Sequence, residues 1–137
     1  DFGRPQQSWM NIGRPTLMAT GDGDNTCNHL EEPGSCFGDS PYIRRIGFER
    51  MPAGNKYLLY IHDADAFHTL FDLRTAECAP GEKPVDPAKC DEIARWLTAA
   101  ALAFLDGNLR QEPLALQWLA SRNIENASLG VAQWRTK

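Results

Sequence analysis

The alternation of apolar and polar positions divides the chain into short strand-like runs and longer helical stretches. Two runs, 16–20 and 56–61, are apolar and rich in β-favouring residues, and turn-forming residues bound them. The first lies between Pro15 and Gly21, which is typical of a strand buried on both faces of a parallel sheet. We therefore predict that the two runs are adjacent strands of a mainly parallel sheet.

The clearest helical period begins at Asp91. Apolar residues recur there on one face of a helix, as Ile93, Trp96, Leu97, Ala100, Ala101, Phe104 and Leu105. This pattern predicts a helix that packs across the sheet and closes at the turn Asp106-Gly107. A second, shorter helix is expected to begin at Pro113 and to end at Arg122-Asn123.

These elements indicate one α/β domain. A chain of 137 residues forms a single modest domain. Residues 1–13 read as a connector, 14–122 as the domain and 123–137 as a tail that packs back or frays. The period of residues 42–49 fits either a helix or an extended segment. Because two strands do not complete a sheet, we expect the isolated chain to be unstable or associated.

Charge and hydropathy exclude some partners. The chain has 14 basic and 18 acidic residues, and its basic residues are scattered apart from the pair Arg44-Arg45. Such a distribution offers no positive field to nucleic acid. No apolar run approaches the roughly 18 residues of a membrane span. Asp1 is neither an initiator methionine nor part of a signal peptide, so we expect a segment to precede it.

The cysteines form two local pairs, Cys27 with Cys36 and Cys78 with Cys90. Pro, Gly, Asn or Asp flank each pair, and the spacing typical of metal ligands is missing. We predict two disulfides that staple loops, which implies a secreted or periplasmic location.

Carboxylates follow the first predicted strand, and a histidine follows the second. Asp24 and His68 come after their strands, and the carboxyl ends of parallel strands meet at one edge of a sheet. A serine hydrolase uses an acid to orient a histidine, which takes the proton of the serine. The chain lacks a Gly-x-Ser-x-Gly element, and its nearest counterpart, 34–38, has Cys36 at the centre. The pattern therefore predicts half of an active site, with the nucleophile upstream.

Several segments in order resemble the C-terminal part of α/β-hydrolases. They are Pro15 to Asp24 with its Thr-Gly-x-x-Asp turn, Lys56 to Ile61, Ala64-Asp65 and the helical ending Phe104-Leu105 with Leu116 to Ala120. The nearest families are the dienelactone-hydrolase-like and platelet-activating-factor-acetylhydrolase-like esterases and the related polyester hydrolases. The resemblance covers about residues 12 to 120 and identifies Asp24 as the triad acid. An ungapped count puts the family histidine at Ala66, so either His68 serves or the histidine has been replaced.

The resemblance implies a C-terminal segment of a serine carboxylic-ester hydrolase that is inactive as this chain alone. Its partners would be the upstream half of the same hydrolase and an ester substrate, and no cofactor is expected. The alternative is a non-catalytic, disulfide-stabilised secreted domain that binds a partner through the loop 26–42. His29 and His62 are expected to be surface or loop histidines. If His68 is not the catalytic base, the alternative is that it packs beside Phe67 and Phe71 with a satisfied ring nitrogen.

A cation site is the remaining alternative for the loop after the first strand. Its oxygen and nitrogen donors are Asp22, Asp24, Asn25, His29, Glu31 and Glu32. The loop lacks the later glycine and the terminal glutamate of a calcium-binding EF-hand. We therefore expect no bound metal.

Overall fold

The protein has a mixed α/β fold built on a three-stranded sheet with the order β1-β2-β3. The structure, a computed structural model, describes residues 7–21, 40–62 and 87–137. The strands are β1 (Thr16–Gly21), β2 (Lys56–Ile61) and β3 (Ala132–Thr136). The helices are α1 (Gln7–Met10), α2 (Ser40–Arg50), α4 (Pro87–Leu109), α5 (Pro113–Leu119) and α6 (Asn123–Ala127).

The two predicted strands are adjacent and parallel, as expected. They pair from Thr16 opposite Lys56 to Gly21 opposite Ile61. The third strand was not foreseen: β3 lies antiparallel to β2, so the sheet is mixed. Alternate residues of β3 are buried, which anchors the predicted tail in the sheet. The turn before it requires positive φ angles at Leu129 and Gly130.

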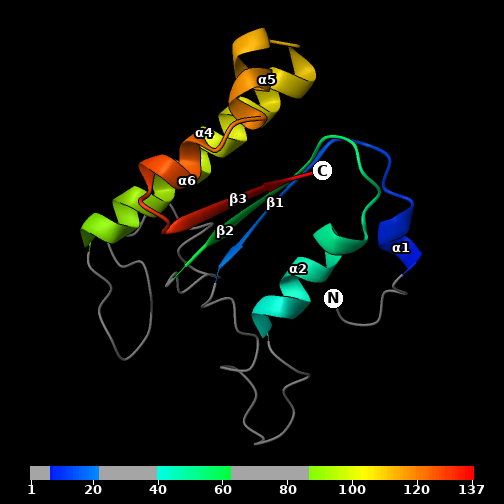
Figure 1. Ribbon diagram of the computed structural model, residues 1–137, viewed down its shortest axis with the longest axis horizontal. Helices are drawn as coiled ribbons and strands as arrows, with labels where there is room; N and C mark the ends of the chain where they lie inside the picture. The colour runs from blue at the N-terminus through cyan, green and yellow to red at the C-terminus, as the bar shows by residue number, and fades with distance from the viewer. Residues whose placement is uncertain (1–6, 22–39, 63–86) are drawn as a thin grey trace, which may run out of the picture.

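The central strand β2 is buried along its whole length because helices cover both faces of the sheet. Figure 1 shows α4, α5 and α6 on one side and α1 and α2 on the other. Tyr57, Leu59 and Ile61 belong to the larger core, on the α4 side. The other members of that core are Ile93, Ala100, Leu119, Ile124, Ala132 and Trp134.

Two segments without a clear period in the sequence are helical. The undecided segment 42–49 lies within α2, and the predicted connector contains the short helix α1. The two helices are joined where Gly47 packs closely: a Cβ atom there would lie 3.1 Å from both Met18 and Trp9. Tertiary packing onto β1 therefore explains helices that local periodicity did not reveal.

The long helix α4 confirms the predicted stripe but not its predicted end. Asp106-Gly107 is not a turn, because the helix continues to Leu109. Gly107 allows α5 to approach, since a Cβ atom on it would lie 2.9 Å from Leu119 Cδ1. The stripe itself is buried at Ile93 and Ala100, whereas Leu105 is 47% exposed and lies outside the core.

We expect Gly107→Ala to destabilise the protein by about 1 kcal/mol. Alanine favours a helix by about 1 kcal/mol over glycine, but overpacking a filled core costs about 1 to 3 kcal/mol. We expect the overlap to outweigh the gain in helix propensity, because the new Cβ atom would lie 2.9 Å from Cδ1 of the buried Leu119 and 3.2 Å from Cδ2 of Leu116, so both side chains would have to shift. Urea unfolding followed by circular dichroism measures the difference. Gly13→Ala is the matched control, because nothing lies within 4 Å of a Cβ atom at Gly13.

A buried lysine clamps the amino ends of β1 and β2. Lys56 is 1% exposed, and its Nζ donates hydrogen bonds to the carbonyl oxygens of Arg14, at 2.6 Å, and Gly54, at 2.9 Å. These bonds replace the water that the ammonium group loses on burial. The clamp helps to hold the two parallel strands in register.

An ion pair joins the end of α2 to β3. Arg135 donates from Nη1 and Nη2 to the two carboxylate oxygens of Glu49, with Nη2 to Oε2 at 3.2 Å. Lys137 Nζ donates to the Glu49 carbonyl oxygen at 2.9 Å. Both cations also lie over the ring of Phe48, at 5.1 and 5.0 Å from its centroid. The hydrogen bond from Arg135 is the main reason that the pKa of Glu49 is lowered.

This pKa shift predicts a small, pH-dependent loss of stability in Glu49→Gln. A carboxyl with a lowered folded pKa stabilises the protein above its unfolded pKa of about 4.3, and the contribution disappears as the pH falls through the folded value. Because the side chains of Arg135 and Glu49 are 39% and 42% exposed, we expect less than about 1 kcal/mol at pH 7. The unfolding free energies of the two proteins, measured in urea, should differ at neutral pH, and the difference should shrink as the pH falls below the unfolded pKa of the carboxyl. A difference that does not change with pH would contradict the ion-pair explanation.

Within the described ranges, no helix combines the length and apolarity needed to cross a membrane. Cys90, at the start of α4, is buried and disulfide-bonded rather than a free thiol. Cys27, Cys36 and Cys78 lie outside the described residues, so the predicted pairings stay predictions.

Candidate functional site

The carboxyl ends of β1 and β2 form the edge at which the sequence predicts the active site. Gly21 and Ile61 end the two strands directly opposite each other. Asp24 follows Gly21 by three residues, and His68 follows Ile61 by seven. Both residues, and Ala66, lie outside the described residues. The pairing therefore establishes that the two segments leave neighbouring points of the sheet, and the contact between Asp24 and His68 stays a prediction.

The described part of this edge carries a cluster of Tyr60, Arg45 and His62. Tyr60 is buried, and the guanidinium carbon of Arg45, from α2, lies 4.6 Å from the centroid of its ring. The imidazole of His62 meets the same ring edge-on, with centroids 5.2 Å apart. A cation over an aromatic face is a favourable contact that holds the guanidinium in place.

His62 is held at this edge by its backbone as well as its ring. Its N–H donates to the Val131 carbonyl oxygen at 2.8 Å, which ties the end of β2 to the start of β3. The side chain is exposed, as predicted for a surface histidine.

The sequence did not predict this cluster, because its residues come from segments that are far apart in the chain. Arg45 stood out only as part of the basic pair Arg44-Arg45, and segment 42–49 fitted two structures. Its approach to Tyr60 depends on the packing of α2 against β2, which is a long-range contact. No local pattern could have paired these two residues.

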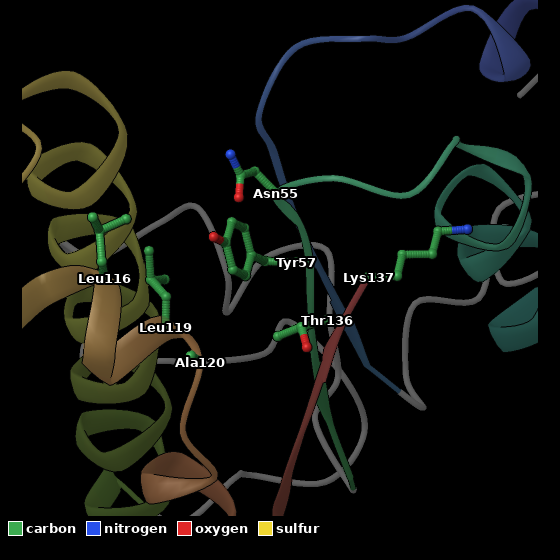
Figure 2. A pocket seen from close by; sticks show the side chains of 7 residues that line it. All are labelled: Asn55, Tyr57, Leu116, Leu119, Ala120, Thr136 and Lys137. Atoms are coloured by element: carbon green, nitrogen blue, oxygen red, sulfur yellow. The ribbon is translucent and has the colours of Figure 1, made fainter.

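A pocket of about 290 Å³ lies at the opposite end of the sheet, between the start of β2 and α5. Figure 2 shows that Leu116 and Leu119 face the ring of Tyr57, whereas the side chain of Lys137 points away from them. The pocket is lined by Asn55, Tyr57, Leu116, Leu119, Ala120, Thr136 and Lys137. Because it adjoins the amino ends of the strands, it is separate from the edge that precedes Asp24 and His68.

Tyr57 is the buried titratable group of this pocket. Burial raises the pKa of its phenol, and a hydrogen bond with the Asn108 side chain acts in the opposite direction. The phenol therefore stays neutral at physiological pH and takes part in hydrogen bonds rather than in proton transfer. Its ring stacks on Trp134 and meets Phe104 edge-on, at centroid distances of 5.7 and 5.9 Å, which makes it a structural side chain.

The described ranges contain no group of three or more His, Cys, Asp or Glu residues that could hold a metal ion. Most of the loop considered for a cation lies outside these ranges. Comparison with protein-family models, with curated proteins and with solved structures finds no match.

Proposed function

We propose that the chain is the C-terminal segment of a serine carboxylic-ester hydrolase, similar to the dienelactone-hydrolase-like and platelet-activating-factor-acetylhydrolase-like esterases. Asp24 is the triad acid and His68 the base, and the nucleophilic serine belongs to a preceding segment or companion chain. The observation that supports this proposal best is the parallel pairing that ends with Gly21 opposite Ile61. It brings the segments that carry the acid and the histidine to one edge of the sheet.

Chain length is compatible with contact between Asp24 and His68. Neighbouring strands lie about 4.8 Å apart, and three extended residues span at most about 10 Å. The longer segment between Ile61 and His68 can fold back across that gap. An orienting carboxylate has to approach the imidazole to about 3 Å, which both segments can reach.

The proposed mechanism is acyl transfer. The serine hydroxyl attacks the ester carbonyl while His68 accepts its proton, and the carboxylate of Asp24 stabilises the imidazolium that forms. His68 then returns the proton to the leaving alcohol, and the acyl group remains on the serine as an ester. Water, deprotonated by His68, attacks this ester and releases the acid and the free serine.

Native mass spectrometry of the protein from its source tests the class. We expect the 15.3 kDa chain to be bound to, or joined to, a polypeptide of about 15 to 20 kDa that completes a hydrolase domain. The complex should hydrolyse p-nitrophenyl acetate, and a fluorophosphonate should label a serine on the companion. A stable, inactive protein without any companion would contradict the proposal and favour the non-catalytic, disulfide-stabilised binding domain.

A further inference from the structure

The outer face of α4 is exposed along most of the helix, opposite the side that packs on the sheet. Its exposed residues recur in alternating steps of four and three, as Asp91, Arg95, Thr98, Leu102, Leu105 and Leu109. This outer stripe has the spacing of a coiled-coil seam. Leu102, Leu105 and Leu109 are 56%, 47% and 75% exposed, so the carboxyl-terminal half of the stripe is an apolar ridge.

The amino-terminal half of the same face forms a shallow groove of about 570 Å³. It is lined by small and polar side chains and by the first leucine of the ridge, as Asp91, Ala94, Arg95, Thr98, Ala99 and Leu102. Because ridge and groove lie on one helix, the ridge cannot reach the groove of its own chain. A second copy in antiparallel orientation places each ridge against the other groove and removes the leucines from water.

We propose that α4 pairs antiparallel with α4 of a second copy across a two-fold axis. The register that matches ridge to groove places Thr98 opposite Leu102 of the second copy. One turn further along, Arg95 lies opposite Leu105 of the second copy. A two-fold axis repeats each contact, so both ridges and both grooves are used. This inference holds whether or not the proposed function is right.

Charges beside the stripe support the same register. Within the described ranges Arg95 forms no ion pair, and in the dimer it lies beside Asp106 of the second copy, the residue that follows Leu105. Asp106 already binds Arg110 at 3.0 Å, so the contact would extend this pair into a network of alternating charge. Parallel pairing in equal register would instead bring Arg95 to Arg95 and Asp106 to Asp106. The charges therefore favour the antiparallel orientation.

The size of the contact predicts a weak dimer. One helical stripe of each copy takes part, which is less than the roughly 1,200 Å² or more that stable interfaces bury. We therefore expect a dissociation constant in the micromolar range.

Sedimentation of the 137-residue chain tests the proposal. We expect a monomer at about 1 µM and a dimer of two identical chains at about 500 µM. Leu105→Glu should raise the dissociation constant by about a hundredfold or more, because it puts a charge into the apolar contact twice. Leu129→Glu is the matched control, since Leu129 is 93% exposed and lies outside the stripe, and should leave the dimer intact. A monomer at every concentration would overturn the proposal, and so would a dimer that Leu105→Glu does not weaken.

Charge reversal tests the register. Arg95→Asp and Asp106→Arg each bring like charges together when a variant pairs with itself, so each should weaken the dimer by about tenfold or more. An equimolar mixture of the two variants should associate again, because every such contact then joins opposite charges. Salt at about 0.15 M screens the general attraction between the oppositely altered chains.

The matched control for Arg95→Asp is Arg122→Asp, which makes the same change in charge on α6, where the Arg122 side chain is 78% exposed. It should leave the dimer intact, and circular dichroism establishes that each variant folds. A mixture that associates no better than either variant alone would overturn the proposed pairing. Ester hydrolysis by the complex with a companion is a separate measurement, so the two proposals fail independently.

Discussion

Replacing His68 with alanine in the proposed hydrolase complex is expected to lower kcat for p-nitrophenyl acetate by roughly 10⁴-fold or more. Without the imidazole, no side chain accepts the serine proton, and only the oxyanion donors and substrate binding still accelerate the reaction. Asp24→Asn should cost roughly 10⁴-fold as well, because an amide does not stabilise the imidazolium. The double variant should be about as slow as either single one, since the two residues act as a unit.

The matched control is His62→Ala, which removes the histidine that directly follows β2. The His62 imidazole is exposed and packs edge-on against Tyr60, so we expect less than about a tenfold change. A large loss of activity in His62→Ala with no loss in His68→Ala would show that His62, and not His68, is the base. If the unaltered complex is nearly inactive, neither single variant changes this, and Ala66→His raises the activity, then the family histidine had been replaced at position 66.

Trp134→Ala is expected to destabilise the chain by about 3 to 5 kcal/mol. Trp134 is 4% exposed, stacks on Tyr57 and contacts Trp118, with ring centroids 5.7 and 5.8 Å apart. Its indole Nε1–H donates to the Leu119 carbonyl oxygen at 2.9 Å. The substitution therefore leaves a cavity and an unpaired buried carbonyl oxygen at the junction of β2, β3 and α5.

Urea unfolding followed by circular dichroism measures this loss, which is a large part of the roughly 5 to 15 kcal/mol that stabilises a typical domain. Trp134→Phe separates the two contributions, because it keeps an aromatic ring beside Tyr57 but removes the N–H. We expect it to cost about 1 to 3 kcal/mol. If Trp134→Ala changes the unfolding free energy by less than about 1 kcal/mol, β3 does not belong to the cooperative unit.

The elements with a strong local period were predictable. The runs 16–20 and 56–61 are strands, and the stripe that starts at Ile93 lies on a helix that packs against the sheet. A period is a property of neighbouring residues, so the sequence reveals it without knowledge of the partners. The same holds for Pro113, which begins α5 because proline suits the first turn of a helix.

At the candidate site, the sequence determined that a carboxylate follows one strand and a histidine the next, and it suggested the chemistry. The tertiary structure confirmed that these strands are adjacent and parallel, and it decided their register, which places Gly21 opposite Ile61. It also brought Arg45 onto Tyr60 from a helix that the sequence left undecided. Side-chain contacts between distant segments carry no signature in either segment alone.

Elsewhere, long-range packing overruled local signals. Gly107 reads as a helix end, yet α4 continues through it because α5 needs that close approach. Residues 132–136 read as part of a tail, yet they form β3 because β2 offers an open edge and the core offers a site for Trp134. The sequence alone thus determined which segments prefer strand or helix and which residues carry candidate chemistry. Only the tertiary structure decided which segments meet, because the energy of pairing and burial belongs to contacts between residues far apart in the chain.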